Sequence, residues 1–234
     1  MAFFDHYSSD KATALGREFV RKSAHMLYLN IKKVQPEAKV ALEIGPGKGY
    51  FCDLWLSHGG EIAAMEANPG MGDALSKKGV RVVEAFAPPL PFDSNAFDVV
   101  VASHVIEHMP TVTKAIELVE EMARVCRSGG LVCIVAPDVR AWKSDFWNAD
   151  YTHNYVTSPR RIEQLFLNTG LHVESQVLFS GHFCGFRGSL LSLLASIFPA
   201  RLLDWLPYSR FLQVKLYKLK LTFLGNFLLI GRKE

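Results

Sequence analysis

The feature that most constrains the fold is an apolar run, Val40–Ile44, that leads into three alternating glycines, Gly45, Gly47 and Gly49. A helical pattern of apolar residues begins directly after the last glycine. This order predicts a buried strand, a tight turn of bare backbone, and a helix whose N-terminus points at a ligand. An acid, Glu66, follows the next apolar run about 20 residues beyond the first glycine, where nucleoside-binding α/β units hold two ribose hydroxyls. We therefore predict a nucleoside site, with a purely structural turn as the alternative.

Glu43, two residues before the first glycine, indicates which nucleoside ligand the turn suits. A dinucleotide would bring its anionic pyrophosphate to this turn. At ~4 Å and an effective dielectric of about 20, a carboxylate would repel that group by roughly 4 kcal/mol. A ligand with an ammonium and a sulfonium would be attracted instead. Glu43 therefore favours S-adenosylmethionine over NAD, and it argues against a nicotinamide-dependent dehydrogenase.

Apolar runs and amphipathic segments alternate along the chain. We expect strands at Val40–Ile44, before Glu66, at Val80–Glu84, Phe97–Ala102 and Leu131–Ala136, and helices at Lys11–Val34, Tyr50–Ser57, after Asn68, and at Thr111–Cys126 and Ser158–Asn168. We expect Gly129 and Gly130 to separate the fourth helix from the strand after it. The alternation predicts an α/β fold with a doubly wound parallel sheet, whose ligands bind at the carboxyl ends of the strands. An aromatic arm, Phe3–Tyr7, is either a fraying terminus or a lid over that edge.

Composition sets the broad class of the protein. With 234 residues, 49% hydrophobic and 21% charged, the chain has the profile of one globular domain. A formal charge of +3 is too small to indicate nucleic acid as a partner. The four cysteines form no CxxC pair, and no signal peptide is apparent, so we expect reduced thiols and a cytoplasmic protein.

As an ordered set, several short motifs resemble class I S-adenosylmethionine-dependent methyltransferases, most closely the group that includes ubiquinone and menaquinone biosynthesis enzymes. The motifs are Glu43–Gly49, Glu66, Leu90–Phe92, Phe97–Val100, Val105–Met109 and Arg127–Leu131. A shorter stretch, Asp150–Ile162, resembles methyltransferases of bacterial surface-glycan pathways. The resemblance covers roughly Lys39 to Ser180 and returns at Leu224–Lys233.

This resemblance implies a Rossmann-like sheet of seven strands with an antiparallel last strand, in which Leu171–Phe179 and Leu224–Gly231 pair as a hairpin. We expect one methyltransferase domain over residues 1–234. Its parts are an N-terminal arm and helix at 1–36, a core at 37–180, a helical insertion or cap at 181–222 and the last strand at 223–234.

The resemblance also implies the residues that bind S-adenosylmethionine. The glycine loop would cradle the methionine part, Glu66 would bind the ribose, and Ser103 and His104 would border the transferred methyl. Many relatives carry an aspartate for the adenine two residues after Glu84, and this chain has Phe86 there. The implied set is Glu43, Gly45, Gly47, Gly49, Glu66, Ala67, Phe86, Ser103 and His104.

The residues that remove the acceptor's proton are predicted from chemistry. For an oxygen acceptor a histidine is the natural base, and we select His153 and His108 over His104. The alternative is a structural role for both. Small-RNA 2′-O-methyltransferases resemble the Val105–His108 stretch and hold magnesium there. In this chain His104 replaces the first acid, and magnesium prefers oxygen ligands, so we expect no bound metal.

The insertion mixes leucines and aromatic residues with arginine and lysine. This pattern suggests an acceptor-binding cap or a peripheral membrane contact through residues 186–220, and the alternative is a helical subdomain that packs on the sheet or in a homodimer. We expect O-methylation of a small molecule, a sugar or a lipid-linked glycan. The alternatives are a quinone-type C- or O-methyltransferase, an NAD-dependent dehydrogenase, or a non-catalytic protein that binds S-adenosylmethionine.

Overall fold

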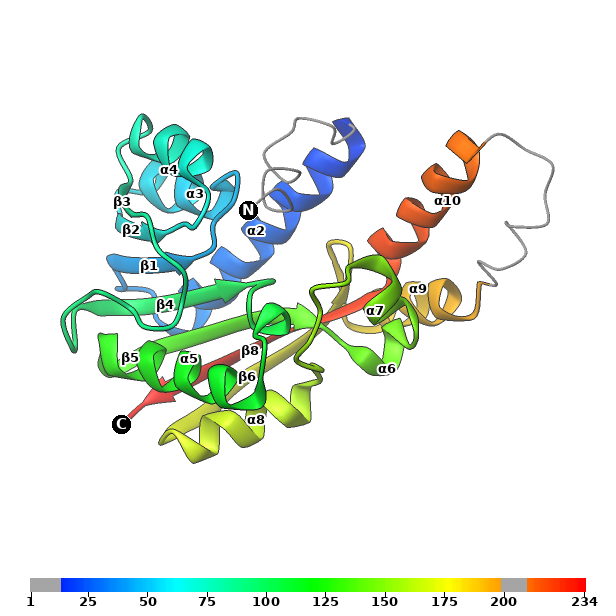
Figure 1. The fold of residues 1–234 in the computed structure, drawn as a ribbon. Helices are drawn as coiled ribbons and strands as arrows, with labels where there is room; N and C mark the ends of the chain where they lie inside the picture. Colours follow the sequence, from blue (N-terminus) through cyan, green and yellow to red (C-terminus); the bar gives the residue numbers. More distant parts are fainter. Residues whose placement is uncertain (1–13, 199–209) are drawn as a thin grey trace.

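The computed structural model describes residues 14–198 and 210–234, and a mostly parallel sheet forms its centre (Figure 1). The eight strands that it describes lie in the order β3-β2-β1-β4-β5-β8-β6-β7. The first five strands pair in parallel, and β8 is antiparallel to both of its neighbours. This arrangement confirms the doubly wound sheet with an antiparallel last strand. The strands are β1 Val40–Ile44, β2 Glu61–Met65, β3 Arg81–Val83, β4 Phe97–Ser103, β5 Cys126–Pro137, β6 Leu171–Ser180, β7 Phe183–Cys184 and β8 Gly225–Lys233.

Helices cover both faces of the sheet (Figure 1). Helices α2 and α3 share one core with one face, and α5 and α8 share a second core with the opposite face. The described helices are α2 Ala14–Val34, α3 Tyr50–Ser57, α4 Pro69–Ser76, the 3-10 helix η1 Ile106–His108, α5 Val112–Val125, α6 Val139–Trp142, α7 Asp145–Ala149, α8 Pro159–Asn168, α9 Gly185–Ile197 and α10 Arg210–Phe223.

Strand β4 shows why the sheet lies between two helical layers. Val99 and Val101 belong to the core under α2 and α3, whereas Val100 and Ala102 belong to the core under α5 and α8. All four are fully buried. A central parallel strand is buried on both faces, so its sequence is a continuous apolar run.

The start of β5 differs from the sequence prediction. Gly129 and Gly130 do not separate helix from strand, because the strand already begins at Cys126. The pairing of β4 with β5 is irregular after Phe97, which faces Cys126. A Cβ on Gly130 would lie 2.7 Å from Cys126 Sγ and 2.8 Å from the Asp98 carbonyl oxygen. Gly130 therefore permits a close backbone approach inside the strand.

Two further differences concern the ends of the fold. The two-residue strand β7 pairs with the end of β6, so the sheet has one strand more than the seven expected. The predicted helix start at Lys11 and the aromatic arm Phe3–Tyr7 lie outside the described residues.

The insertion contributes α9 and α10, which lie at the carboxyl edge of the sheet (Figure 1). Lys220 of α10 forms a buried ion pair with Asp145 of α7 at 2.6 Å. Tyr217 donates a hydrogen bond to the same carboxylate at 3.1 Å. Within residues 14–198 and 210–234, no helix has the length and apolar content needed to span a membrane.

Candidate functional site

The glycine loop between β1 and α3 adopts backbone angles that favour glycine. Gly45, Gly47 and Gly49 have φ values of 64°, 55° and 72°, all in the left-handed region. A Cβ on Gly45 would lie 2.8 Å from Val105 Cγ2, and one on Gly49 would overlap Leu75 Cδ2. A Cβ on Gly47 would meet nothing within 4 Å. The loop therefore leaves open space beside its middle glycine.

Glu66, directly after β2, connects this loop to the next strand end. Its Oε2 accepts a hydrogen bond from the Gly47 amide at 3.0 Å, and its Oε1 accepts one from the Asn68 amide at 2.9 Å. The side chain is buried, and the neighbouring Ala67 is half-buried. Each carboxylate oxygen can accept a second hydrogen bond. Glu66 can therefore fix the loop and still accept hydrogen bonds from a ligand diol.

Glu43 lies in β1, where its Oε2 accepts a hydrogen bond from the Cys52 thiol of α3 at 3.0 Å. The side chain is only 4% exposed. Burial raises the pKa of Glu43 to about 7, and the hydrogen bonds from Cys52 offset only part of that effect. Attraction of a cationic ligand requires the ionised form of this carboxyl. The structure adds that this carboxyl gains and loses its proton close to neutral pH.

The end of β4 lies beside the glycine loop, because Ile44 pairs with Ala102 in the parallel register. Ser103 and His104 follow directly. The His104 amide donates to the Val135 carbonyl at 2.9 Å, and its side chain is half exposed. His104 has φ 57°, an uncommon angle for a residue with a Cβ. The register thus brings Gly45, Ser103 and His104 to one edge of the sheet, as predicted.

Phe86 lies on the segment after β3, and its side chain is 63% exposed. An exposed aromatic ring at this position can stack on a base. Its role in adenine binding stays a prediction.

Two histidines face each other next to this edge, and the structure fixes the tautomer of each. His153 Nδ1 lies 2.7 Å from the Phe146 carbonyl oxygen, which can only accept, so Nδ1 carries the proton. Thr152 Oγ1 donates to Asp150 Oδ1 at 2.7 Å and therefore accepts from His108 Nδ1 at 2.7 Å. In the neutral form, both Nε2 atoms consequently carry a lone pair. The ring centroids of the two histidines are 4.9 Å apart.

Burial keeps His108 largely neutral near pH 7. Burial lowers the pKa of His108 and the nearby His153 lowers it further, although Glu107 and Asp150 act in the opposite direction. Glu107 is fully buried, which alone would raise its pKa. The hydrogen bond from His104 at 3.1 Å and the charges of His104 and His108 outweigh that effect, so the pKa of Glu107 is lowered.

Glu107, His108 and His153 each offer one ligand atom, and these atoms lie within 4.8 Å of one another. Among the described residues, Oε2 of Glu107 has no hydrogen-bond partner. The geometry is therefore compatible with a cation. The absence of a bound metal stays a prediction from the sequence.

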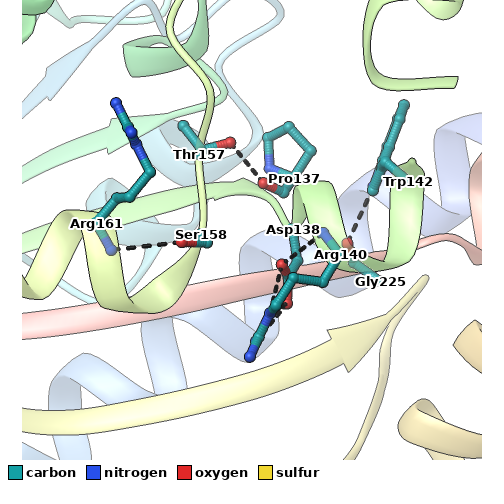
Figure 2. Close-up of polar contacts among 8 residues, drawn as sticks. All are labelled: Pro137, Asp138, Arg140, Trp142, Thr157, Ser158, Arg161 and Gly225. Carbon is teal, nitrogen blue, oxygen red and sulfur yellow. Dashed lines mark hydrogen bonds and ion pairs between the residues drawn. The ribbon is translucent and has the colours of Figure 1, made fainter. Parts of the chain in front are cut away.

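The segment that carries His153 is fixed to the carboxyl end of β5 (Figure 2). Thr157 Oγ1 donates to the Pro137 carbonyl at 2.5 Å, and Trp142 Nε1 donates to the Gly225 carbonyl at 3.0 Å. The ring centroids of Trp142 and His153 are 6.3 Å apart. Three residues that orient the histidines were not identified from the sequence. They are Asp150, Thr152 and Phe146. The proximity of Asp150 and Thr152 to His153 in the chain was the only signal for them.

Known proteins match the part of the chain that contains the glycine loop, Glu66 and His108. Residues 42–134 match a family model described as a methyltransferase domain. An uncharacterised methyltransferase of Mycobacterium leprae (strain Br4923) is 33% identical over 112 residues, which is 46% of this chain and 40% of the relative. The chain thus spans less than half the length of this relative.

Solved structures share the fold over most of the chain. A S-adenosylmethionine-dependent methyltransferase from Archaeoglobus fulgidus superposes with a TM-score of 0.65 at 19% identity, covering 93% of this chain and 94% of that chain. The [4+2]-cyclase SpnF superposes with a TM-score of 0.62 at 16% identity, covering 88% and 79%. At such identities the likeness shows the fold alone, and the cyclase is a reminder that fold does not determine reaction.

A pair of glycine substitutions separates ligand contact from packing. Gly47→Ala adds only the strain of a left-handed residue, about 1 kcal/mol, whereas Gly49→Ala must also displace Leu75 and is expected to cost roughly 2 kcal/mol or more. Denaturant unfolding measures both. We expect Gly47→Ala to weaken S-adenosylhomocysteine binding despite its small stability cost. Equal unfolding free energies for the two variants would contradict this interpretation of the loop.

The raised pKa of Glu43 makes stability depend on pH. Between its ordinary value of 4.5 and about 7, the unfolded chain loses a proton that the folded protein keeps, so stability falls as pH rises through this range. The expected loss is on the order of 3 kcal/mol. Glu43→Gln should flatten the unfolding free energy between pH 4.5 and 7, and the exposed Glu61→Gln should not. A pH profile unchanged by Glu43→Gln would exclude Glu43 as the source.

Proposed function

We propose that this chain, which carries a S-adenosylmethionine-dependent methyltransferase domain, methylates a hydroxyl group of a small molecule, a sugar or a lipid-linked glycan. The family match supports the domain and its methyl donor. The observation that carries the choice of oxygen as acceptor atom is the pair of histidines whose Nδ1 atoms both form hydrogen bonds, because each Nε2 then carries a lone pair when the ring is neutral. A hydroxyl has to lose its proton during transfer, and these atoms can accept it.

The loop and strand ends would hold the donor in the following way. Glu66 would accept hydrogen bonds from the ribose hydroxyls while it keeps the Gly47 and Asn68 amides in place. Glu43 in its ionised form would attract the positive charge of the methionine part. The half-exposed His104, next to Ser103, would border the methyl group.

The transfer step needs orientation and one proton acceptor. The bound donor supplies a methyl group on a sulfonium that leaves as a neutral thioether. The acceptor oxygen would form the new bond to the methyl carbon as the carbon–sulfur bond breaks. The electron pair of the broken bond would stay on sulfur. The hydroxyl proton passes to Nε2 of His108 or His153. Asp150 and Thr152 keep His108 in the tautomer that can accept it.

Other functions remain as alternatives with distinct outcomes. A quinone-type ring acceptor would use the same donor site. A nicotinamide-dependent dehydrogenase would bind NADH, and a non-catalytic protein would bind S-adenosylmethionine without turnover. Calorimetry with S-adenosylhomocysteine and NADH in parallel separates the dehydrogenase from the other classes, and a turnover assay separates the non-catalytic protein. Binding of NADH without S-adenosylhomocysteine would overturn the proposed function.

Substitution of the histidines tests the proton acceptor. We expect His108→Gln or His153→Gln to slow formation of S-adenosylhomocysteine from hydroxyl acceptors by about 100-fold or more, since general bases contribute at least that factor. Calorimetric affinity for S-adenosylhomocysteine should be unchanged. The exposed His172→Gln is the matched control. A chelator should not affect turnover, and full activity of both histidine variants would remove them from the mechanism.

The insertion supports a peripheral membrane contact. Helix α9 exposes Phe186, Leu194 and Ile197, and neither α9 nor α10 contains an acidic residue. Exposed apolar side chains beside Arg187 and Lys218 suit the surface of an anionic bilayer. A homodimer that covers the same face is the alternative.

Vesicle flotation tests this contact. We expect the protein to float with vesicles that contain phosphatidylglycerol, and the double variant Phe186→Ser/Ile197→Ser to partition roughly tenfold more weakly. Leu167→Ser, which removes a similarly exposed apolar side chain from α8, should have no effect. Equally weakened vesicle binding by Leu167→Ser, or failure of the wild type to float with the vesicles, would count against the membrane contact. For the alternative homodimer, sedimentation velocity would report a dimer.

A further inference from the structure

A cavity of about 310 Å³ lies at the carboxyl edge of the sheet, separate from the glycine loop. Its lining comes from α6, α9, β6 and β8, and it includes Asp138, Arg140, Ser189, Ser192, Leu178 and Asn226. Its size is at the lower end of the range for small-molecule sites. Figure 2 shows one of its walls, where Asp138 and Arg140 lie near Gly225 and Trp142.

Polar groups line this cavity. Asn226 is about nine-tenths buried, and its Oδ1 has no hydrogen-bond partner within the described residues. The hydroxyls of Ser189 and Ser192 also line the cavity. An unpaired buried amide oxygen costs about 1–3 kcal/mol. A ligand with both hydrogen-bond donors and acceptors would satisfy these groups.

The charge of the cavity favours a neutral ligand. Arg140 donates from Nε and Nη2 to both carboxylate oxygens of Asp138, with the shortest distance 2.6 Å. The ion pair neutralises the guanidinium, so no net positive charge remains to attract a phosphate or carboxylate. Beside these polar groups, the cavity presents the apolar side chains of Leu178 and Leu193. Hydroxyl groups on an apolar carbon frame match this mixture.

The position of the cavity relates it to the methyl-transfer site. Asn226 of β8 pairs with Pro137 of β5, and Val135 of β5 pairs with Ser103 of β4. Asn226 is therefore two strand spacings, about 10 Å, from Ser103 across the sheet, and two residues, about 7 Å, further along the strands. Trp142 separates the cavity from His153. A ring bound in the cavity would therefore belong to a part of the acceptor other than the reacting group.

We propose that this cavity binds a neutral, hydroxyl-rich ring, such as a sugar or another polyol, as a part of the acceptor other than the methylated hydroxyl. That the cavity binds such a ring is inferred from the cavity alone. That the ring is part of the methyl acceptor rests on the proposed function.

Amide NMR spectra of the full chain test the proposal. Methyl α-D-glucopyranoside, N-acetylglucosamine and myo-inositol are the probes, and inorganic phosphate is the charged comparison. We expect at least one polyol to shift the amide signals of Ser189, Ser192 and Gly225, and phosphate to leave them unchanged. Ser189→Phe, which fills the cavity from an exposed helix position, and Asn226→Leu should weaken that binding about tenfold or more. The exposed Ser57→Phe on α3 should not.

Three outcomes would overturn the proposal: no shift with any polyol, shifts with phosphate alone, or equal polyol binding by wild type and Ser189→Phe. Thermal melting of each variant shows whether it is folded. If Asn226→Leu does not fold, Ser189→Phe alone tests the proposal. A parallel titration with S-adenosylhomocysteine keeps the two proposals apart. Failure of the wild type to bind it contradicts the methyltransferase, while loss of polyol binding alone contradicts only the cavity.

Discussion

The structure of the site depends on one carboxylate, that of Glu66, which accepts hydrogen bonds from the amides of Gly47 and Asn68. These amides belong to the turns after β1 and β2, so a single side chain sets the distance between two adjacent strand ends. Charged acceptors form the stronger class of hydrogen bond. The open space beside Gly47 is then a fixed feature of the edge, with the β4 end on its other side. Every residue assigned to the donor except Phe86 lies within or next to these turns.

Much of the fold could be predicted from the sequence because local signals determine it. The bounds of β1 and α3 agree with the sequence prediction, and Asn68, Thr111 and Ser158 all accept N-cap hydrogen bonds at the helix starts. Hydrophobic periodicity, capping residues and turn glycines each determine the structure of only a few neighbouring residues. The resemblance supplied the order of the last strands, which local patterns alone do not determine.

The features that sequence reasoning missed depend on long-range pairing. Gly130 lies inside a strand, where the Asp98 carbonyl of the neighbouring β4 approaches its backbone. The tautomers of the two histidines depend on Phe146 and Thr152, whose positions follow from the packing of α7 and the segment after it. The same limit applies to Glu43. Its type and place were evident, but the burial that shifts its pKa became apparent only in three dimensions.

The buried contact between Glu43 and Cys52 has a consequence for the heat of ligand binding. Near neutral pH a fraction of the molecules carry a proton on this carboxyl. A cation that settles beside Glu43 favours the ionised form, so the proton is transferred to the buffer. The measured enthalpy then contains the ionisation heat of that buffer. The enthalpies measured in phosphate and in Tris would differ by the difference between the two ionisation heats times the fraction of a proton released, and that fraction would report how close the ligand's charge comes to Glu43.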